Sequence, residues 1–155
     1  MKKLVLVGLV SLTLFGCAQE PLKKQTSSGK PEGVYPNHTP DQVIEALVQN
    51  CNEKGFTIEE QTKNNVVCSR EMQGGGAIFT QALIGNSYST TPLQKVRYSV
   101  SKFKTGSKVW ADAWAETQMA LGQVNKMSYD NNQTKNNIQS VLDQTIPAIL
   151  TSTSH

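Results

Sequence analysis

Residues that could perform acid, base or nucleophilic chemistry are few and scattered in this chain. Its two histidines are His38 and His155, the last residue. Asp112 and Glu116 are four positions apart, which on a strand separates the two carboxylates by roughly 13 Å, too far for a glycosidase pair. The serines lack a GxSxG turn and a neighbouring base. The sequence therefore predicts no catalytic centre, no metal site and no enzyme activity.

Glycines 74–76 are the only local pattern that suggests a nucleotide-binding loop. No Lys-Ser or Lys-Thr pair follows them, and no strand–helix–strand unit surrounds them. Both features are needed for a loop whose backbone N–H groups hold phosphates. Nucleotide binding is therefore not expected.

The first seventeen residues combine a short basic start, an apolar run and a cysteine. Lys2 and Lys3 precede the apolar stretch 4–15, which is too short to span a bilayer comfortably and is typical of an export signal. The stretch ends in Leu-Phe-Gly-Cys, with leucine three positions before Cys17 and a small residue directly before it. This pattern resembles the lipobox of bacterial lipoproteins.

The resemblance implies a covalent lipid anchor. In that family the thiol matching Cys17 receives a diacylglycerol, the signal peptide (here residues 1–16) is removed, and the new amine is acylated, commonly with palmitate. Ala18 in place of aspartate implies the outer membrane where the host has one, with the domain facing the periplasm. An ordinary secretory signal with an incidental cysteine, or a weak transmembrane helix, are the alternatives. No cofactor other than the lipid is expected.

Residues 17–38 follow as the lipidated cysteine and a flexible linker, because they are rich in Pro, Gly, Ser and Lys and lack apolar periodicity. About twenty residues of such coil span on the order of 25 Å. The remaining 39–151 suffice for one domain. The net charge of +3 includes Lys2 and Lys3, so a product that starts at Cys17 carries 3 − 2 = +1. Near-neutrality argues against a nucleic-acid partner.

Cys51 and Cys68 form an even pair once Cys17 is set aside, in a compartment that permits disulfides. A bridge between them would close a loop of about 17 residues and stabilise the fold by roughly 3 kcal/mol. A redox or metal site is the alternative, but the pair lacks CxxC spacing and nearby histidines. A structural disulfide is the favoured interpretation.

The domain itself is predicted to be α+β. Thr39-Pro40-Asp41-Gln42 has the features of a helix start, and Gly55 those of a left-handed helix end. Alternation predicts one hairpin over 56–71 and a second over 95–116, and Thr134 is expected to cap a final helix that Pro147 ends or kinks. We expect a four-stranded antiparallel sheet with the N-terminal and C-terminal helices on one face, in the order α-β-β-β-β-α.

The segment between the hairpins is long and apolar for a connection in a small domain. It is interpreted either as a short helix or strand that completes the core, or as a mobile loop that inserts into a partner or lipid. The residues concerned are Ile78, Phe79, Leu83 and Ile84.

Trp110 and Trp114 alternate with alanines in the second hairpin. If the alanines face the helices, both indoles lie on the open face, where paired tryptophans would suit a binding surface. The reverse assignment, or coverage by the 74–92 segment, is the alternative.

Together these features predict a membrane-anchored envelope lipoprotein whose domain binds another protein, with Trp110, Trp114 and the 74–92 segment as the contact surface. A binder or sensor of a lipid or other amphiphile, with the same segment as a lid, is the runner-up. A hydrolase with an unrecognised site is a third alternative.

Overall fold

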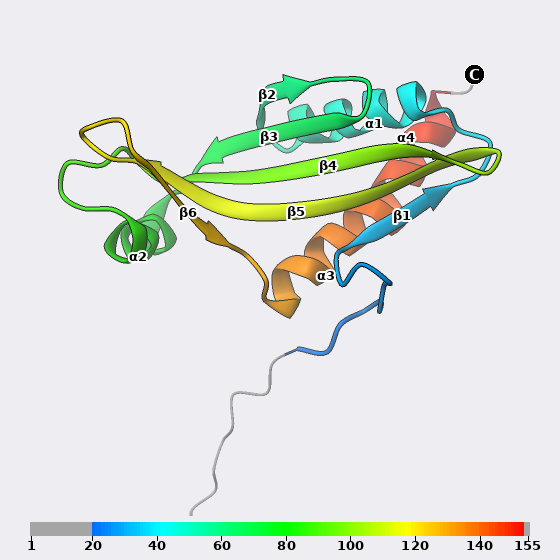
Figure 1. Ribbon diagram of the computed structural model, residues 1–155. Coiled ribbons are helices and arrows are strands. Elements are labelled where there is room, and N and C mark those ends of the chain that lie inside the picture. Colours follow the sequence, from blue (N-terminus) through cyan, green and yellow to red (C-terminus); the bar gives the residue numbers. More distant parts are fainter. Residues whose placement is uncertain (1–19, 154–155) are drawn as a thin grey trace, which may run out of the picture.

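The computed structural model describes residues 20–153. Cys17 and the signal peptide lie outside the described residues. A single antiparallel sheet runs in the order β1-β5-β4-β3-β2, and β6 also pairs with β5 (Figure 1). The strands are β1 (Glu32–Tyr35), β2 (Thr57–Gln61), β3 (Asn65–Glu71), β4 (Leu93–Phe103), β5 (Gly106–Gln118) and β6 (Val124–Ser128). The helical elements are α1 (Pro40–Glu53), α2 (Gly74–Ile84), α3 (Asn132–Ser140), η1 (Val141–Thr145) and α4 (Ile146–Ser152).

The helices cover one face of the sheet, here called the inner face (Figure 1). Alternation along each strand sends every second side chain to this face, so that Val96 pairs with Ala113 and Tyr98 with Ala111. With the buried residues of α1 and α4 these side chains form one core. The other face, called the outer face, carries Lys95, Arg97, Trp110 and Trp114. The predicted α+β class and antiparallel pairing are therefore confirmed.

Helix α1 begins and ends as its sequence predicts. The Thr39 side chain accepts from the Gln42 backbone N–H at 3.3 Å, and the Gln42 side-chain oxygen accepts from the Thr39 backbone N–H at 2.9 Å. This capping box satisfies backbone donors that have no partner inside the helix. At the other end Gly55 has φ 70°, and the Phe56 N–H donates to the Cys51 carbonyl at 2.9 Å. Glycine adopts this left-handed conformation without the clash that a Cβ would cause.

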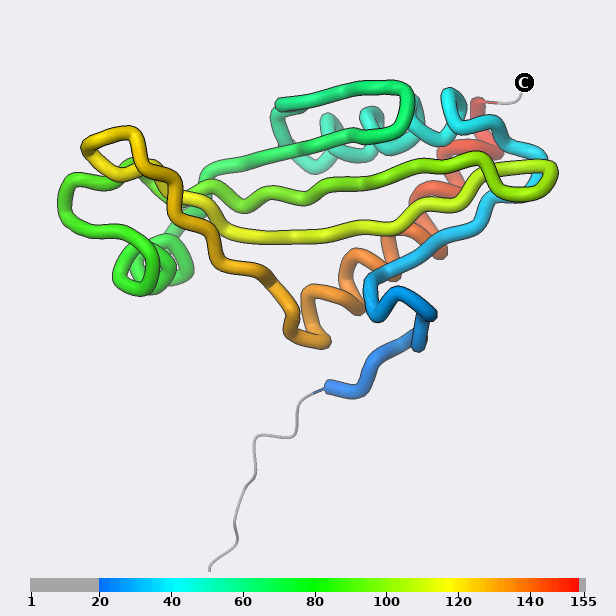
Figure 2. The backbone as a smooth tube through the Cα atoms, viewed as in Figure 1, coloured from blue at the N-terminus to red at the C-terminus, as the bar shows by residue number. Residues whose placement is uncertain are grey.

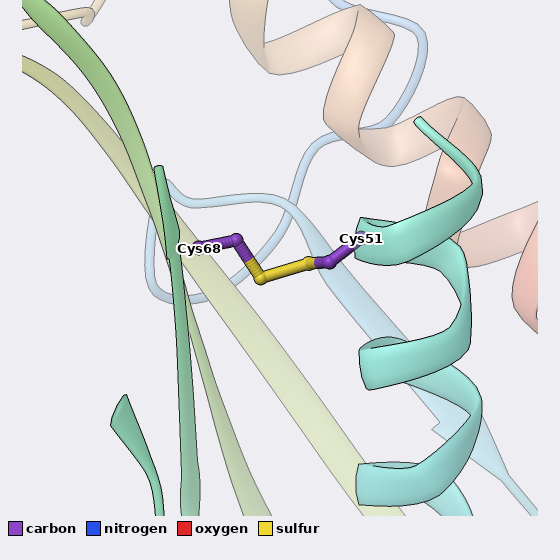
Figure 3. Close-up of a disulfide and its surroundings, with 2 residues drawn as sticks. All are labelled: Cys51 and Cys68. Carbon is purple, nitrogen blue, oxygen red and sulfur yellow. A yellow bond between two sulfur atoms is a disulfide. The ribbon is translucent and has the colours of Figure 1, made fainter. Parts of the chain in front are cut away.

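The predicted disulfide between Cys51 and Cys68 is confirmed. It joins the last turn of α1 to β3, across 17 positions of sequence, with 6.3 Å between the two Cα atoms (Figure 3). Both cysteines are buried in the core. The bond therefore fastens the C-terminal end of α1 to the inner face of the sheet.

The prediction of four strands is wrong, because two short strands share one edge of β5. β1 pairs with β5 over 107–110 and β6 pairs with it over 114–118. β1 falls within the predicted linker, so the linker assignment through His38 is wrong for these residues. A four-residue strand, Glu-Gly-Val-Tyr between two prolines, has too little periodicity to be predicted from sequence, and its pairing with β5 is a long-range effect.

The last helix is longer than predicted and begins earlier. Asn131, rather than Thr134, caps α3, because its side chain accepts from the Thr134 backbone N–H at 2.8 Å. Pro147 does not end the helix. The π-helical turn η1 stands directly before it, and α3, η1 and α4 follow one another without a break to Ser152. A proline removes one backbone donor, and a local π turn accommodates that loss.

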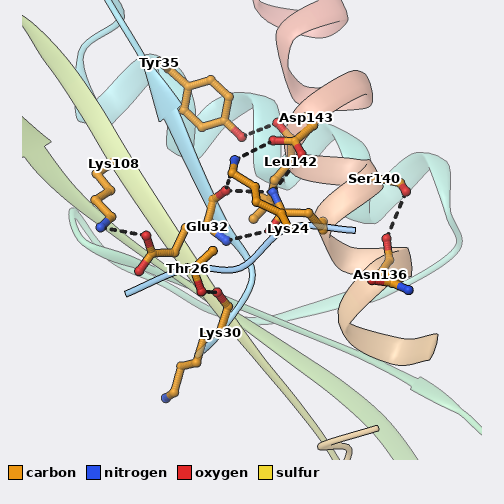
Figure 4. Close-up of polar contacts among 11 residues, drawn as sticks. Lys24, Thr26, Lys30, Glu32, Tyr35, Lys108, Asn136, Ser140, Leu142 and Asp143 are labelled. Atoms are coloured by element: carbon orange, nitrogen blue, oxygen red, sulfur yellow. Dashed lines mark hydrogen bonds and ion pairs between the residues drawn. The ribbon is translucent and has the colours of Figure 1, made fainter. Parts of the chain in front are cut away.

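Residues 20–31, here called the strap, lie against α3 (Figure 4). Asn136 is 2% exposed, accepts from the Lys23 backbone N–H at 2.7 Å and donates to the Pro21 carbonyl at 2.9 Å. One turn later Gln139 bonds both backbone groups of Glu32, at 3.0 and 2.8 Å. Two buried side-chain amides of α3 therefore hold the backbone at the two ends of the strap. This part of the predicted flexible linker is attached to the domain.

Asn136→Ala is expected to release the start of the strap. Because two backbone groups lose their partners, the free energy of unfolding should fall by about 1–3 kcal/mol. Trypsin should then cleave after Lys23 and Lys24 faster than in the wild type. Gln133→Ala, an exposed position on the same helix, is the matched control. Equal cleavage rates in Asn136→Ala and wild type would contradict the role given to Asn136.

Candidate functional site

Trp110 and Trp114 lie on the outer face, as in the first of the two assignments considered from sequence. Trp110 is paired with Ser99 and Trp114 with Lys95, while the intervening Ala111 is buried on the inner face. Each ring is partly buried rather than fully open. The structure therefore places both tryptophans on the same face of β5, away from the helices, with Asp112 between them.

Cations cover both indole rings. The Lys30 ammonium lies 4.2 Å from the centroid of Trp110, and Arg97 and Lys126 lie 5.3 and 5.6 Å from that of Trp114. Such cation–π contacts each contribute about 0.5–1 kcal/mol at exposed sites. The rings are thus already occupied by side chains of the same chain, which lowers their availability to a partner.

The carboxylates of the outer face are paired in the same way. Lys95 Nζ lies 2.7 Å from Glu59 and 2.9 Å from Glu116. Glu116 also accepts from the Trp114 indole N–H at 3.0 Å, and Lys126 Nζ lies 3.4 Å from the same carboxylate. Burial would raise the pKa of Glu116, but these hydrogen bonds from Lys95 and Trp114 outweigh it and the pKa is lowered. A carboxylate held ionised by three partners is poorly suited to donate or take up protons at neutral pH.

A polar cleft of about 410 Å³ opens where β1 and β6 diverge along the edge of β5. Its charged side chains include two ion pairs, Lys30 with Asp112 at 2.7 Å and Lys135 with Asp130 at 3.4 Å. Within residues 20–153 no cluster of His, Cys, Asp or Glu side chains could hold a metal ion. The cleft has no sequence signal, because distant strands form it.

The five most exposed large hydrophobic side chains among the described residues lie at the far end of the sheet, here called the apolar end. They are Leu121 (91%), Tyr88 (82%), Ile78 (73%), Phe79 (64%) and Leu83 (55%). Three of them belong to α2, and the others to the two loops beside it (Figure 2). The segments 72–94 and 117–125, which build this end, contain no charged residue.

Helix α2 corrects one sequence interpretation and leaves another open. The segment is a helix, but Ile78, Phe79 and Leu83 are exposed, so they do not complete the core; Ile84 is half-buried. Thr80 is its buried residue, and Asn125 Nδ2 donates to the Ile84 carbonyl at 2.8 Å. α2 contacts β5 and β6, and its buried residue is Thr80, so Ile78, Phe79 and Leu83 face away from the sheet. A role in partner binding stays a prediction.

An apolar cavity of about 330 Å³ lies on the inner face between the C-terminal half of α1 and α3. It lies where α1 packs chiefly against α4 and separates from α3. The sequence did not predict it, since its lining comes from six elements that lie far apart in the chain, α1, β3, β4, β5, α3 and η1. This cavity, the apolar end and the outer face are the three candidate sites.

Comparison with protein-family models, curated proteins and solved structures found no match for this chain. Function must therefore be argued from the surfaces described above.

The paired outer face predicts a specific loss of stability in acid. The pKa of Glu116 is lowered from its ordinary 4.5 in the folded protein, so its contribution to stability is complete above that value and is lost as the pH falls through the folded pKa. The free energy of unfolding, measured by urea denaturation between about pH 7 and pH 3, should fall with pH. Glu116→Gln should show a shallower dependence, and an unchanged slope would contradict the network.

Proposed function

We propose that this chain is a lipid-anchored protein of the bacterial cell envelope whose domain binds another protein through the apolar end. The observation that carries the proposal is the exposure of Ile78, Phe79, Leu83, Tyr88 and Leu121 at one uncharged end. A soluble surface rarely gathers large hydrophobic side chains in this way unless something covers them. Aromatic and aliphatic anchors of this kind dominate the energetics of protein interfaces.

The outer face is the weaker part of the surface predicted from sequence. Trp110 and Trp114 carry cations on their rings, and Glu116 is held by three partners. Displacing these contacts would cost a partner part of what it gains on binding. We therefore assign docking to α2 and its neighbouring loops, and give the two tryptophans the role of fixing the outer face.

The proposed anchor is the acylated Cys17, in an outer membrane whose periplasmic side the domain faces. Its support is the lipobox-like sequence that ends at Cys17, with Ala18 after it. The disulfide between Cys51 and Cys68 is typical of an oxidising compartment outside the cytoplasm. No helix among the described residues is long and apolar enough to cross a membrane. We assign neither enzymatic activity nor nucleic-acid binding to the domain.

Cys17→Ser should abolish the anchor. Cells fed an alkyne-tagged palmitate should label the wild-type chain, and its mature mass should correspond to a chain that starts at residue 17 plus the lipid. The serine variant should carry no label, because a hydroxyl does not replace the thiol in this modification. Labelling of Cys17→Ser equal to that of the wild type would refute the anchor.

The docking surface is tested by photocrosslinking in living cells. A benzoylphenylalanine at position 79 of the full chain should crosslink a discrete protein, and Leu83→Ser should weaken that crosslink about tenfold, the order expected when one interface anchor is lost. Position 103 serves as the matched control, since Phe103 is an exposed aromatic at the opposite end of β4. Equal crosslinking from both positions, or adducts with lipid alone at position 79, would rule out the proposed protein interface.

A second candidate function, binding of an amphiphile, is favoured by the cavity between α1 and α3. Its volume of about 330 Å³ falls in the range of small-molecule sites. It lies on the inner face and is built by residues other than those of the apolar end. The chemistry of a ligand that fits it can be argued from its lining.

A further inference from the structure

The cavity between α1 and α3 has an apolar floor. Val96, Tyr98 and Ala113 of the sheet form its base, with Phe56 at one end and Ile138 and Val141 on the α3 side. Burial raises the pKa of Tyr98 to about 12, so this floor carries no charge at neutral pH. A hydrocarbon chain placed here would be removed from water, at a gain of about 0.8 kcal/mol per buried CH₂.

One polar atom in the wall of this cavity has no partner. Asn50 lies on α1, is 3% exposed and lines the cavity. Its side-chain oxygen Oδ1 is buried and accepts no hydrogen bond from any described residue, and it is the only buried side-chain polar atom among them in that position. A buried acceptor without a donor costs about 1–3 kcal/mol, and rotation of the Asn50 side chain into the cavity, toward a ligand hydroxyl or amide N–H, would remove that cost.

Two cations stand at the mouth of the cavity without a carboxylate. Lys54 lies one turn after Asn50 on α1, and Arg70 is on β3 opposite. Among residues 20–153 neither belongs to an ion pair. Arg70 is positioned by Gln94, which accepts from its Nε and Nη2 at 3.3 Å, and by the Phe56 ring at 4.7 Å. Glu71 follows Arg70 on β3 and by alternation points to the outer face.

We propose that this cavity binds a single-chain anionic amphiphile. The acyl chain lies over Val96, Tyr98 and Ala113, the anionic head group pairs with Lys54 and Arg70, and the Asn50 side chain turns into the cavity so that Oδ1 accepts from a hydroxyl or amide of the head. One cavity thus combines an apolar floor with two unpaired cations at its mouth, as an acyl chain with an anionic head group requires. This site develops the second candidate function and does not involve α2, so its failure would leave the proposed protein docking untouched.

The experiment uses the oxidised chain Ala18–His155, which retains every described residue and therefore the whole core and the disulfide. Isothermal titration below the micellar concentration compares three probes. Lauroyl lysophosphatidylglycerol supplies chain, anion and hydroxyl; dodecyl maltoside supplies the same chain length without charge; glycerol 3-phosphate supplies the head without a chain. We expect binding of the first with a dissociation constant at least about tenfold lower than for the other two, because only it satisfies the cations and the floor together.

Three variants locate the ligand. Lys54→Gln/Arg70→Gln changes two exposed side chains and should weaken binding of the lysophospholipid about tenfold or more, with only a small fall in the melting temperature from the loss of the contact between Arg70 and Phe56. Lys63→Gln, an exposed lysine in the turn between β2 and β3, is the matched control and should bind as the wild type does. Asn50→Leu should weaken binding while it raises the melting temperature, since it removes the unpaired acceptor. A residue with only a structural role would not produce that combination.

Several results would overturn the proposal. They are the absence of binding below the micellar concentration, equal affinity for dodecyl maltoside, equal affinity for glycerol 3-phosphate alone, or unchanged affinity in Lys54→Gln/Arg70→Gln. Absence of binding would show that there is no site. Equal affinity for dodecyl maltoside would show a site that does not depend on charge, and equal affinity for glycerol 3-phosphate would show a site for a free anion. The last would place the ligand outside this cavity.

Discussion

Strand β5 carries the constraint on which the rest of the structure depends. It pairs with β4 along its length and with both β1 and β6 on its other edge, so it can present side chains to only two faces. Its inner face carries Val109 and then three alanines, at 111, 113 and 115. Short side chains let the helices approach the sheet closely. Where α1 and α3 separate, Ala113 is too small to fill the space, and the same stripe that permits close packing leaves the cavity.

The outer face of β5 follows from the same alternation. Every residue excluded from the inner face must be accommodated in contact with water, and two of these are tryptophans. Lys30 from the strap and Arg97 from β4 cover the rings, and Glu116 accepts a hydrogen bond from the indole N–H of Trp114. The aromatic area is thus shielded within the chain itself. At the apolar end no charged residue is near enough in sequence to do the same for Phe79 or Leu83, which explains why exposure is concentrated there.

Local features of this fold could be predicted from sequence, and long-range features could not. The capping box at Thr39, the left-handed Gly55 and the two hairpins depend on neighbours within a few residues. The disulfide followed from cysteine parity and compartment. By contrast β1 is four residues long, and Gly33 within it is required because a Cβ there would lie 2.5 Å from the Tyr35 hydroxyl, a contact made only in the folded chain. The outward turn of α2 depends on which side of it β5 and β6 occupy.

The candidate sites also divide into local features, which the sequence predicts, and features that depend on long-range packing. Residue type and alternation identified Trp110, Trp114 and the apolar segment, but not the cations that cover the indoles. The cavity was not predictable, because Asn50 and Lys54 have no special pattern on α1 and their significance depends on Arg70 and Ile138 across the gap.

The strap limits how far the domain can lie from residue 17. With Glu20 attached to Asn132 through its carbonyl, only Ala18 and Gln19 lie between Glu20 and the proposed anchor at Cys17, a reach of about 10 Å rather than the 25 Å of a free linker. If Cys17 carries the proposed lipid, this short connection would hold the domain close to the membrane surface.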